Sequence, residues 1–156
     1  MTDLDFPVVA ASVALFAAAL KLGGGLYECL LLDRVWPANP SLIQPHRGGV
    51  NRKLFWMPLH FAFEIAVVIA LWLAWDDEHA RIWLLLAAGS HLVMRAWSFA
   101  YFIPRALAFE AADELGPELQ AQARRWVRLS IWRLPLDVIT LLSTYVATLA
   151  LVTATQ

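Results

Sequence analysis

Four long apolar segments alternate with polar stretches along the chain. The segments cover residues 6–32, 54–75, 82–103 and 129–152. Each reaches the roughly 20 residues that an α-helix needs to cross the hydrocarbon core of a bilayer. Lipid chains offer no hydrogen-bond partners to the backbone, and an α-helix satisfies its backbone N–H and C=O groups internally. The pattern therefore predicts an all-α integral membrane protein, an antiparallel four-helix bundle that forms one domain over residues 1–156.

The connections between these segments differ in length. Residues 33–53 contain three prolines and two glycines, which predicts an irregular loop, either a functional lid or an ordered loop packed on the bundle mouth. A short polar turn, DDEHAR, joins the second and third spans. Residues 104–128 are expected to be partly helical, with a break at Gly116-Pro117. We expect the third span to end before Pro104 and Pro135 to kink the fourth.

Composition supports the membrane interpretation and narrows the chemistry. Hydrophobic residues make up 60% of the chain, a larger fraction than in an ordinary soluble domain. The net charge of −1 does not favour nucleic-acid binding. The single cysteine, Cys29, excludes an intramolecular disulfide and a cysteine-rich metal site. Acidic rather than basic residues precede the first apolar run, so we expect a mature span there and no cleaved signal peptide.

The distribution of basic residues predicts the orientation. The termini and the second loop hold only Arg81 among lysines and arginines. The first and third loops hold Arg34, Arg47, Arg52, Lys53, Arg105, Arg124, Arg125 and Arg128. The positive-inside rule then places these two loops in the cytoplasm and both termini outside a cytoplasmic (inner) membrane.

The distribution of tryptophans supports this orientation, because tryptophan side chains favour the headgroup level of a membrane. Trp36, Trp56, Trp126 and Trp132 would mark the cytoplasmic interface. Trp72, Trp75 and Trp83 would mark the outer one.

Each span carries a pair of ionisable or imidazole side chains at helical spacing. The pairs are Lys21 with Glu28, His60 with Glu64, His91 with Arg95, and Arg133 with Asp137. A charged group inside a membrane costs about 2.5–3.5 kcal/mol on insertion scales and normally has a partner. Three cations balance three carboxylates, so we expect the pairs to meet between the helices.

Depth along the spans also brings most of these groups together. With a rise of 1.5 Å per residue, all but Lys21 fall in the cytoplasmic half, His60 about 9 Å and His91 about 18 Å from the ends of their spans. Ser130, Arg133, Asp137, Thr140 and Thr144 form one polar stripe on the fourth span. These positions predict a polar pocket that opens toward loops 33–53 and 104–128.

The leading functional hypothesis is a membrane enzyme, oxidoreductase-like, that acts on a lipidic or aromatic ligand. His60 and Glu64 would handle protons, with His91 as a second base. Arg95 and Arg133 would hold an anion. Asp137, Glu28 and Lys21 complete the expected ligand-binding set.

Three other interpretations stay open. His60, Glu64 and His91 supply the ligand types of a non-haem iron or zinc site, and the two histidines could ligate haem only if both rings faced one porphyrin. The same groups could conduct protons or small anions. They could also be structural, holding the helices of a membrane subunit in register.

The fourth span, RRWVRLSIWRLPLDVITLLSTYVATLAL, resembles the end of the anthrone-oxygenase-like family of small four-span membrane proteins. Trp132 and Arg133 fit that family's pattern, and Ser130 stands where asparagine is expected. The segment GGGLYECLLLDRVWP is similar to the family's first span. For some members, the resemblance implies oxygen-dependent chemistry on a polycyclic phenolic substrate.

Overall fold

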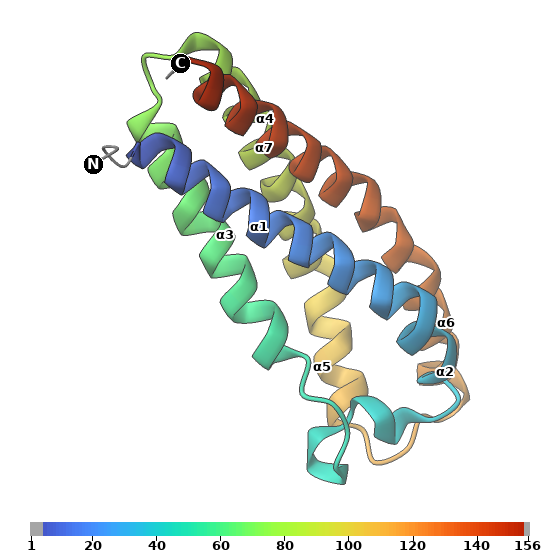
Figure 1. Ribbon diagram of the computed structural model, residues 1–156. Coiled ribbons are helices and arrows are strands. Elements are labelled where there is room, and N and C mark those ends of the chain that lie inside the picture. The colour runs from blue at the N-terminus through green and yellow to red at the C-terminus, as the bar shows by residue number, and fades with distance from the viewer. Residues whose placement is uncertain (1–4, 155–156) are drawn as a thin grey trace.

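A computed structural model describes residues 5–154, and within this range the secondary structure is helical. The helices that form the bundle are α1 (Phe6–Tyr27), α3 (Lys53–Leu73), α4 (Glu78–Trp97) and α7 (Leu134–Ala154). The start of α1, the end of α7 and the turn between α3 and α4 lie at one end of the bundle (Figure 1). The two longer loops lie at the other end, as an antiparallel arrangement requires.

Three of these helices continue beyond an irregular turn. α1 passes through a π-helical turn, Glu28–Leu32, into α2 (Asp33–Val35), and α4 passes through another, Ser98–Phe102, into α5 (Ile103–Ala111). α6 (Pro117–Ser130) joins α7 through a 3₁₀ turn, Ile131–Arg133. The described chain therefore has four continuous helices long and apolar enough to cross a membrane, at residues 6–35, 53–73, 78–111 and 117–154.

The expectation that the third span ends before Pro104 is wrong. The backbone continues through the π turn, in which the Ile103 amide donates to the Ser98 carbonyl, and Pro104 stands in the first turn of α5. Proline lacks an N–H and its ring crowds the preceding turn, and a wider π turn accommodates both. In the fourth span, the 3₁₀ turn lies just before Pro135, where the sequence predicts a kink.

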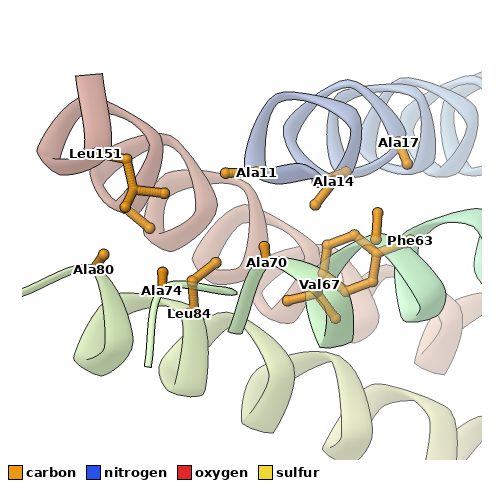
Figure 2. Packing of buried hydrophobic residues seen from close by; sticks show 13 residues of the cluster. Ala11, Ala14, Ala17, Phe63, Val67, Ala70, Ala74, Ala80, Leu84 and Leu151 are labelled. Carbon is orange, nitrogen blue, oxygen red and sulfur yellow. The ribbon is translucent and has the colours of Figure 1, made fainter. Parts of the chain in front are cut away.

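Small side chains form the core in the half of the bundle nearest the termini. α1 packs against α3 and α7, and α4 packs against α7, whereas α3 and α4 touch each other much less. Figure 2 shows Ala14 and Ala17 of α1 pointing toward Phe63 and Val67 of α3. Ala11, Ala14, Ala17 and Ala18 are buried, and their small side chains let the helices approach closely.

A second, aromatic core lies at the loop end of the bundle. Its buried members are Trp36, Ile43, Phe102, Phe109, Ala123 and Trp126. Trp36 and Trp126 are 0% and 3% exposed, so both indoles pack inside the protein and not on its surface. Each indole N–H has a partner inside the protein, Asp33 for Trp36 and the Phe102 carbonyl for Trp126. Trp132, by contrast, is exposed.

The loop between α2 and α3 is folded against α5. It contains two 3₁₀ turns, Pro40–Ile43 and Pro45–Arg47. The buried Gln44 amide donates to the Phe109 and Ala112 carbonyls, which lie at the carboxyl end of α5. Those carbonyls lack helical partners, so one side chain both caps α5 and fixes the loop. The loop is therefore an ordered segment packed on the bundle end.

We predict that Gly49→Ala destabilises the protein. A Cβ atom at Gly49 would overlap the backbone of Ser41, Leu42 and Gln44, so the loop must shift. The expected loss is about 1–3 kcal/mol of unfolding free energy, typical of overpacking. Thermal unfolding in detergent measures it.

Gly23→Ala is the matched control, because a Cβ atom there meets nothing within 4 Å and Gly23 lies inside α1. It should leave stability unchanged or raise it by up to about 1 kcal/mol. Equal melting temperatures for the two variants would contradict the packed-loop description.

Candidate functional site

A buried lysine on α1 lies at the centre of the bundle. The Lys21 side chain is 1% exposed. Its Nζ lies 2.7 Å from His91 Nδ1, 3.4 Å from Asp137 Oδ1 and 4.4 Å from the centroid of the Phe63 ring. An ammonium group only donates hydrogen bonds, so His91 Nδ1 must accept. Lys21 therefore joins α1 to α4 and α7.

The other side of His91 continues this connection. With Nδ1 accepting, the neutral ring carries its proton on Nε2, which donates to Glu64 Oε1 at 3.1 Å. Arg95 Nε donates to the same oxygen at 2.9 Å. Asp137, Lys21, His91, Glu64 and Arg95 thus form an unbroken set of contacts across α7, α1, α4 and α3, here called the ionic chain. Its two cations and two carboxylates balance.

The structure brings five predicted residues together in the ionic chain but separates His60 from Glu64. Glu64 faces α4, whereas the His60 ring stacks on Trp56 at a centroid distance of 5.6 Å and lies 5.5 Å from the His91 ring. Neither ring nitrogen of His60 has a hydrogen-bond partner among residues 5–154. The expected His60–Glu64 proton-handling pair is therefore not assembled.

The expected difference in depth between the two histidines is also wrong. The short turn at residues 74–77 joins α3 to α4, and it is the common reference for their depth. His60 lies thirteen residues before the last residue of α3, and His91 lies thirteen residues after the first residue of α4, which is about 20 Å along each helix. The predicted depths differ because they are counted from the loop ends of the two spans, and these ends do not lie at the same height.

A cavity of about 410 Å³ lies beside the ionic chain, toward the loop end. α3 forms one wall, and α4 with α5 forms the facing wall, where these helices are least in contact. The lining is mostly apolar. Its charged members are Glu28, Arg52, Lys53, Arg95, Glu110, Arg133 and Asp137, four cations against three carboxylates. The lining therefore carries an excess positive charge.

Arg133 is the cation of this lining that lacks a carboxylate. Its guanidinium donates to Ser130 Oγ at 2.7 Å and lies 4.2 Å from the Phe102 ring centroid and 5.6 Å from that of Trp126. Within the described range, no ion pair involves it. Arg95, by contrast, is paired with Glu64. Of the two arginines expected to hold an anion together, Arg95 is therefore already paired with a carboxylate, whereas Arg133 is not.

The remaining charges of the cavity are paired or hydrogen-bonded. Glu28 Oε1 accepts from the Trp56 indole at 2.8 Å, which links α3 to the π turn after α1. Glu110 accepts from Arg52 at 3.4 Å and from Lys53 at 3.0 Å. These contacts line the loop end of the cavity. They also leave Arg133 as the group with unused capacity for an anion.

Each of the three irregular turns contributes residues to the cavity wall. Glu28 and Cys29 come from the first π turn, Ser98 and Phe102 from the second, and Arg133 from the 3₁₀ turn. π turns inside α-helices are frequent at functional sites, because they change the direction of side chains and free backbone groups. Sequence patterns did not reveal the π turns, and Pro104 was the available signal for one of them.

The geometry does not assemble the metal-ligand set allowed by the sequence. Within residues 5–154, no group of three His, Cys, Asp or Glu side chains converges as a metal site requires. For the set His60, Glu64 and His91, the reason is local. Both ring nitrogens of His91 are engaged, by Lys21 and Glu64, and Glu64 points away from His60 toward Arg95.

Several lining residues lay outside the predicted site. Trp56 precedes His60 by four residues, and this helical spacing could have identified it. Arg52, Lys53 and Glu110 bring together segments far apart in sequence, so no local pattern contains them. Ser130 was noted on the polar stripe, and its hydroxyl now holds the Arg133 guanidinium.

We predict that Lys21→Met destabilises the bundle strongly. It would leave Asp137 buried without its cation and remove the donor to His91 Nδ1. Breaking a buried ion pair from one side costs about 3–5 kcal/mol. Thermal unfolding in detergent should show a large loss for Lys21→Met and partial recovery in the double variant with Asp137→Asn.

Lys53→Met is the control, because Lys53 is half-exposed in its pair with Glu110 and such pairs contribute about 1 kcal/mol or less. Similar melting temperatures for Lys21→Met and Lys53→Met would refute a central role for the ionic chain.

Comparison of the chain with protein-family models, with curated proteins and with solved structures gives no match. The resemblance to the anthrone-oxygenase-like family therefore stays a prediction.

Proposed function

We propose that this chain is an integral membrane protein that binds an amphipathic aromatic or lipid anion in the cavity and exchanges a proton with it. The observation that carries the proposal is an apolar cavity with an unpaired guanidinium, Arg133, and a histidine, His60, without hydrogen bonds. An apolar pocket with a few convergent polar groups is the usual form of a small-molecule site. The four long apolar helices support membrane insertion.

Exposed apolar residues at the cavity rim support access from the bilayer. Met57 and Phe61 on α3, and Phe99 and Leu107 on the facing wall, are each more than 40% exposed and also line the cavity. In a membrane these side chains would contact acyl chains. A ligand with an apolar body can then pass from lipid between α3 and the facing helix without crossing water.

Charge distribution supports access from the cytoplasmic leaflet. The cavity lies toward the end that holds the loops rich in arginine and lysine, and the positive-inside rule assigns that end to the cytoplasm. The membrane in question is then the cytoplasmic (inner) membrane, with both termini outside.

The chemistry assigned to the site is proton transfer at an acidic oxygen or carbon. Neutral His60 accepts the proton, and Arg133 stabilises the anion that forms through charge-assisted hydrogen bonds. Trp56 holds the imidazole by stacking. Such a pair suits a phenol or a carbon acid next to a carbonyl group. The oxidoreductase-like reaction implied by the family resemblance stays a prediction.

The packing beyond the cavity favours a blind site over a transport path. The half of the bundle nearest the termini is filled by alanines with Phe63, Val67 and Leu84. Thr140, Thr144 and Thr148 donate to carbonyls of their own helix, so they present methyl groups rather than a polar path. The residues of the ionic chain suit the structural role that the sequence left open. Arg133 and His60 suit ligand binding.

We expect Arg133→Gln to weaken binding of an anionic probe selectively. Native mass spectrometry in detergent would compare palmitate with hexadecanol, which has the same chain without charge. Loss of a hydrogen bond to a charged group should reduce palmitate affinity roughly ten- to a hundred-fold and leave hexadecanol unchanged.

Arg105→Gln is the matched control, since Arg105 lies on α5 outside the cavity lining. Thermal unfolding would confirm that both variants fold. Equal palmitate binding by the wild type and Arg133→Gln would refute the anion site.

The proton-transfer role predicts that the cavity ionises a bound phenol. A 4-nitrophenol carrying an alkyl chain should show a larger ionised fraction at pH 7 when bound, seen as phenolate absorbance. His60→Gln and Arg133→Gln should each reduce that fraction, because one removes the proton acceptor and the other the cation. Unchanged absorbance in His60→Gln, with the probe still bound, would exclude His60 as the base.

A further inference from the structure

A second concave region lies on another face of the protein, between α2 and α6. This groove of about 670 Å³ is lined by Asp33, Arg34, Pro37, Ala38, Gln120, Ala121, Arg124, Val127 and Arg128. None of these residues lines the cavity described above. The groove is therefore separate from the proposed ligand site.

The groove gathers arginines that have no partner in the protein. Arg34, Arg124 and Arg128 are exposed, and within residues 5–154 none of their side chains makes a hydrogen bond, an ion pair or a ring contact. The carboxylate of the lining, Asp33, is buried and accepts from Trp36 through Oδ1, while Oδ2 has no partner. Three cations against one carboxylate leave a net positive groove with unused donors, which favours an anion.

Apolar side chains continue the groove toward the membrane-spanning part. Leu31 precedes Arg34 by three residues, and Ile131 and Trp132 follow Arg128 by three and four residues, so each lies next to its arginine on the side of the membrane-spanning segment. All three are more than half exposed. A basic groove at the end of the bundle that passes into exposed apolar surface matches a headgroup followed by acyl chains.

We propose that this groove binds an anionic glycerophospholipid of the cytoplasmic leaflet, with the phosphodiester on Arg34, Arg124 and Arg128 and the acyl chains against Leu31, Ile131 and Trp132. A soluble polyanion would use the arginines alone, and the adjacent apolar surface favours the lipid. Basic pockets beside membrane helices recognise lipid headgroups in this way.

Lipid titrations of the full chain in detergent, followed by native mass spectrometry, test the proposal. Phosphatidylglycerol should bind more tightly than phosphatidylcholine with the same acyl chains. Arg124→Gln and Arg128→Gln should each reduce phosphatidylglycerol affinity about five-fold, the usual effect of one basic residue near an anionic lipid surface. Phosphatidylcholine affinity should not change.

Arg125→Gln is the matched control, because Arg125 is exposed on α6 but does not line the groove. It should retain the wild-type affinity for phosphatidylglycerol. Equal effects of Arg124→Gln and Arg125→Gln would overturn the proposal in favour of general attraction to positive charge. Displacement of bound phosphatidylglycerol by millimolar inorganic phosphate, or by heparin as a soluble polyanion, would overturn a lipid as the occupant.

Discussion

The bundle depends on one buried ammonium group. Lys21 lies on the border between the alanine-rich core near the termini and the cavity near the loops, and its Nζ contacts both His91 and Asp137. Removing an ammonium group from water costs several kcal/mol unless its donors are used. Because these partners come from α4 and α7, the requirement fixes three helices at one level, and His91 extends the constraint to α3 through Glu64. The ionic chain thus sets the register of helices whose apolar surfaces alone would allow sliding.

The same constraint explains why there is a cavity. Between Lys21 and the termini, alanine side chains let α1, α3 and α7 pack closely, so no cavity forms between these helices. Between Lys21 and the loops, the Glu64–Arg95 ion pair joins α3 to α4. Beyond this pair, the side chains of these helices leave the cavity open between them. Irregular turns in three of the helices occur at this level, where regular α-helical packing has ended. A close-packed half near the termini and a cavity near the loops fit a site that binds a ligand without passing it through the protein.

Two arginine-bearing regions divide the remaining chemistry. Arg133 is enclosed between aromatic rings and held by Ser130, so its charge is directed into an apolar space. Arg34, Arg124 and Arg128 lie on the surface and have no such enclosure. A guanidinium in a low-dielectric cavity selects one anion strongly, whereas exposed guanidinium groups act collectively and are screened by salt. The proposed ligand site and the proposed lipid groove therefore differ in selectivity for a physical reason.

The sequence by itself determined the four apolar helices, their antiparallel order and the meeting of charged side chains from different spans inside the bundle. These features follow from hydrophobic length and from the cost of an unpaired charge in an apolar surrounding, and both are local properties. Only the tertiary structure decided which groups pair. His60 and Glu64 share a helix but contact different neighbours, Trp36 and Trp126 are buried in a cluster of distant segments, and the π turn before Pro104 extends a helix that local rules end. Pairing depends on helix rotation and on contacts between residues far apart in sequence, which no periodic pattern specifies.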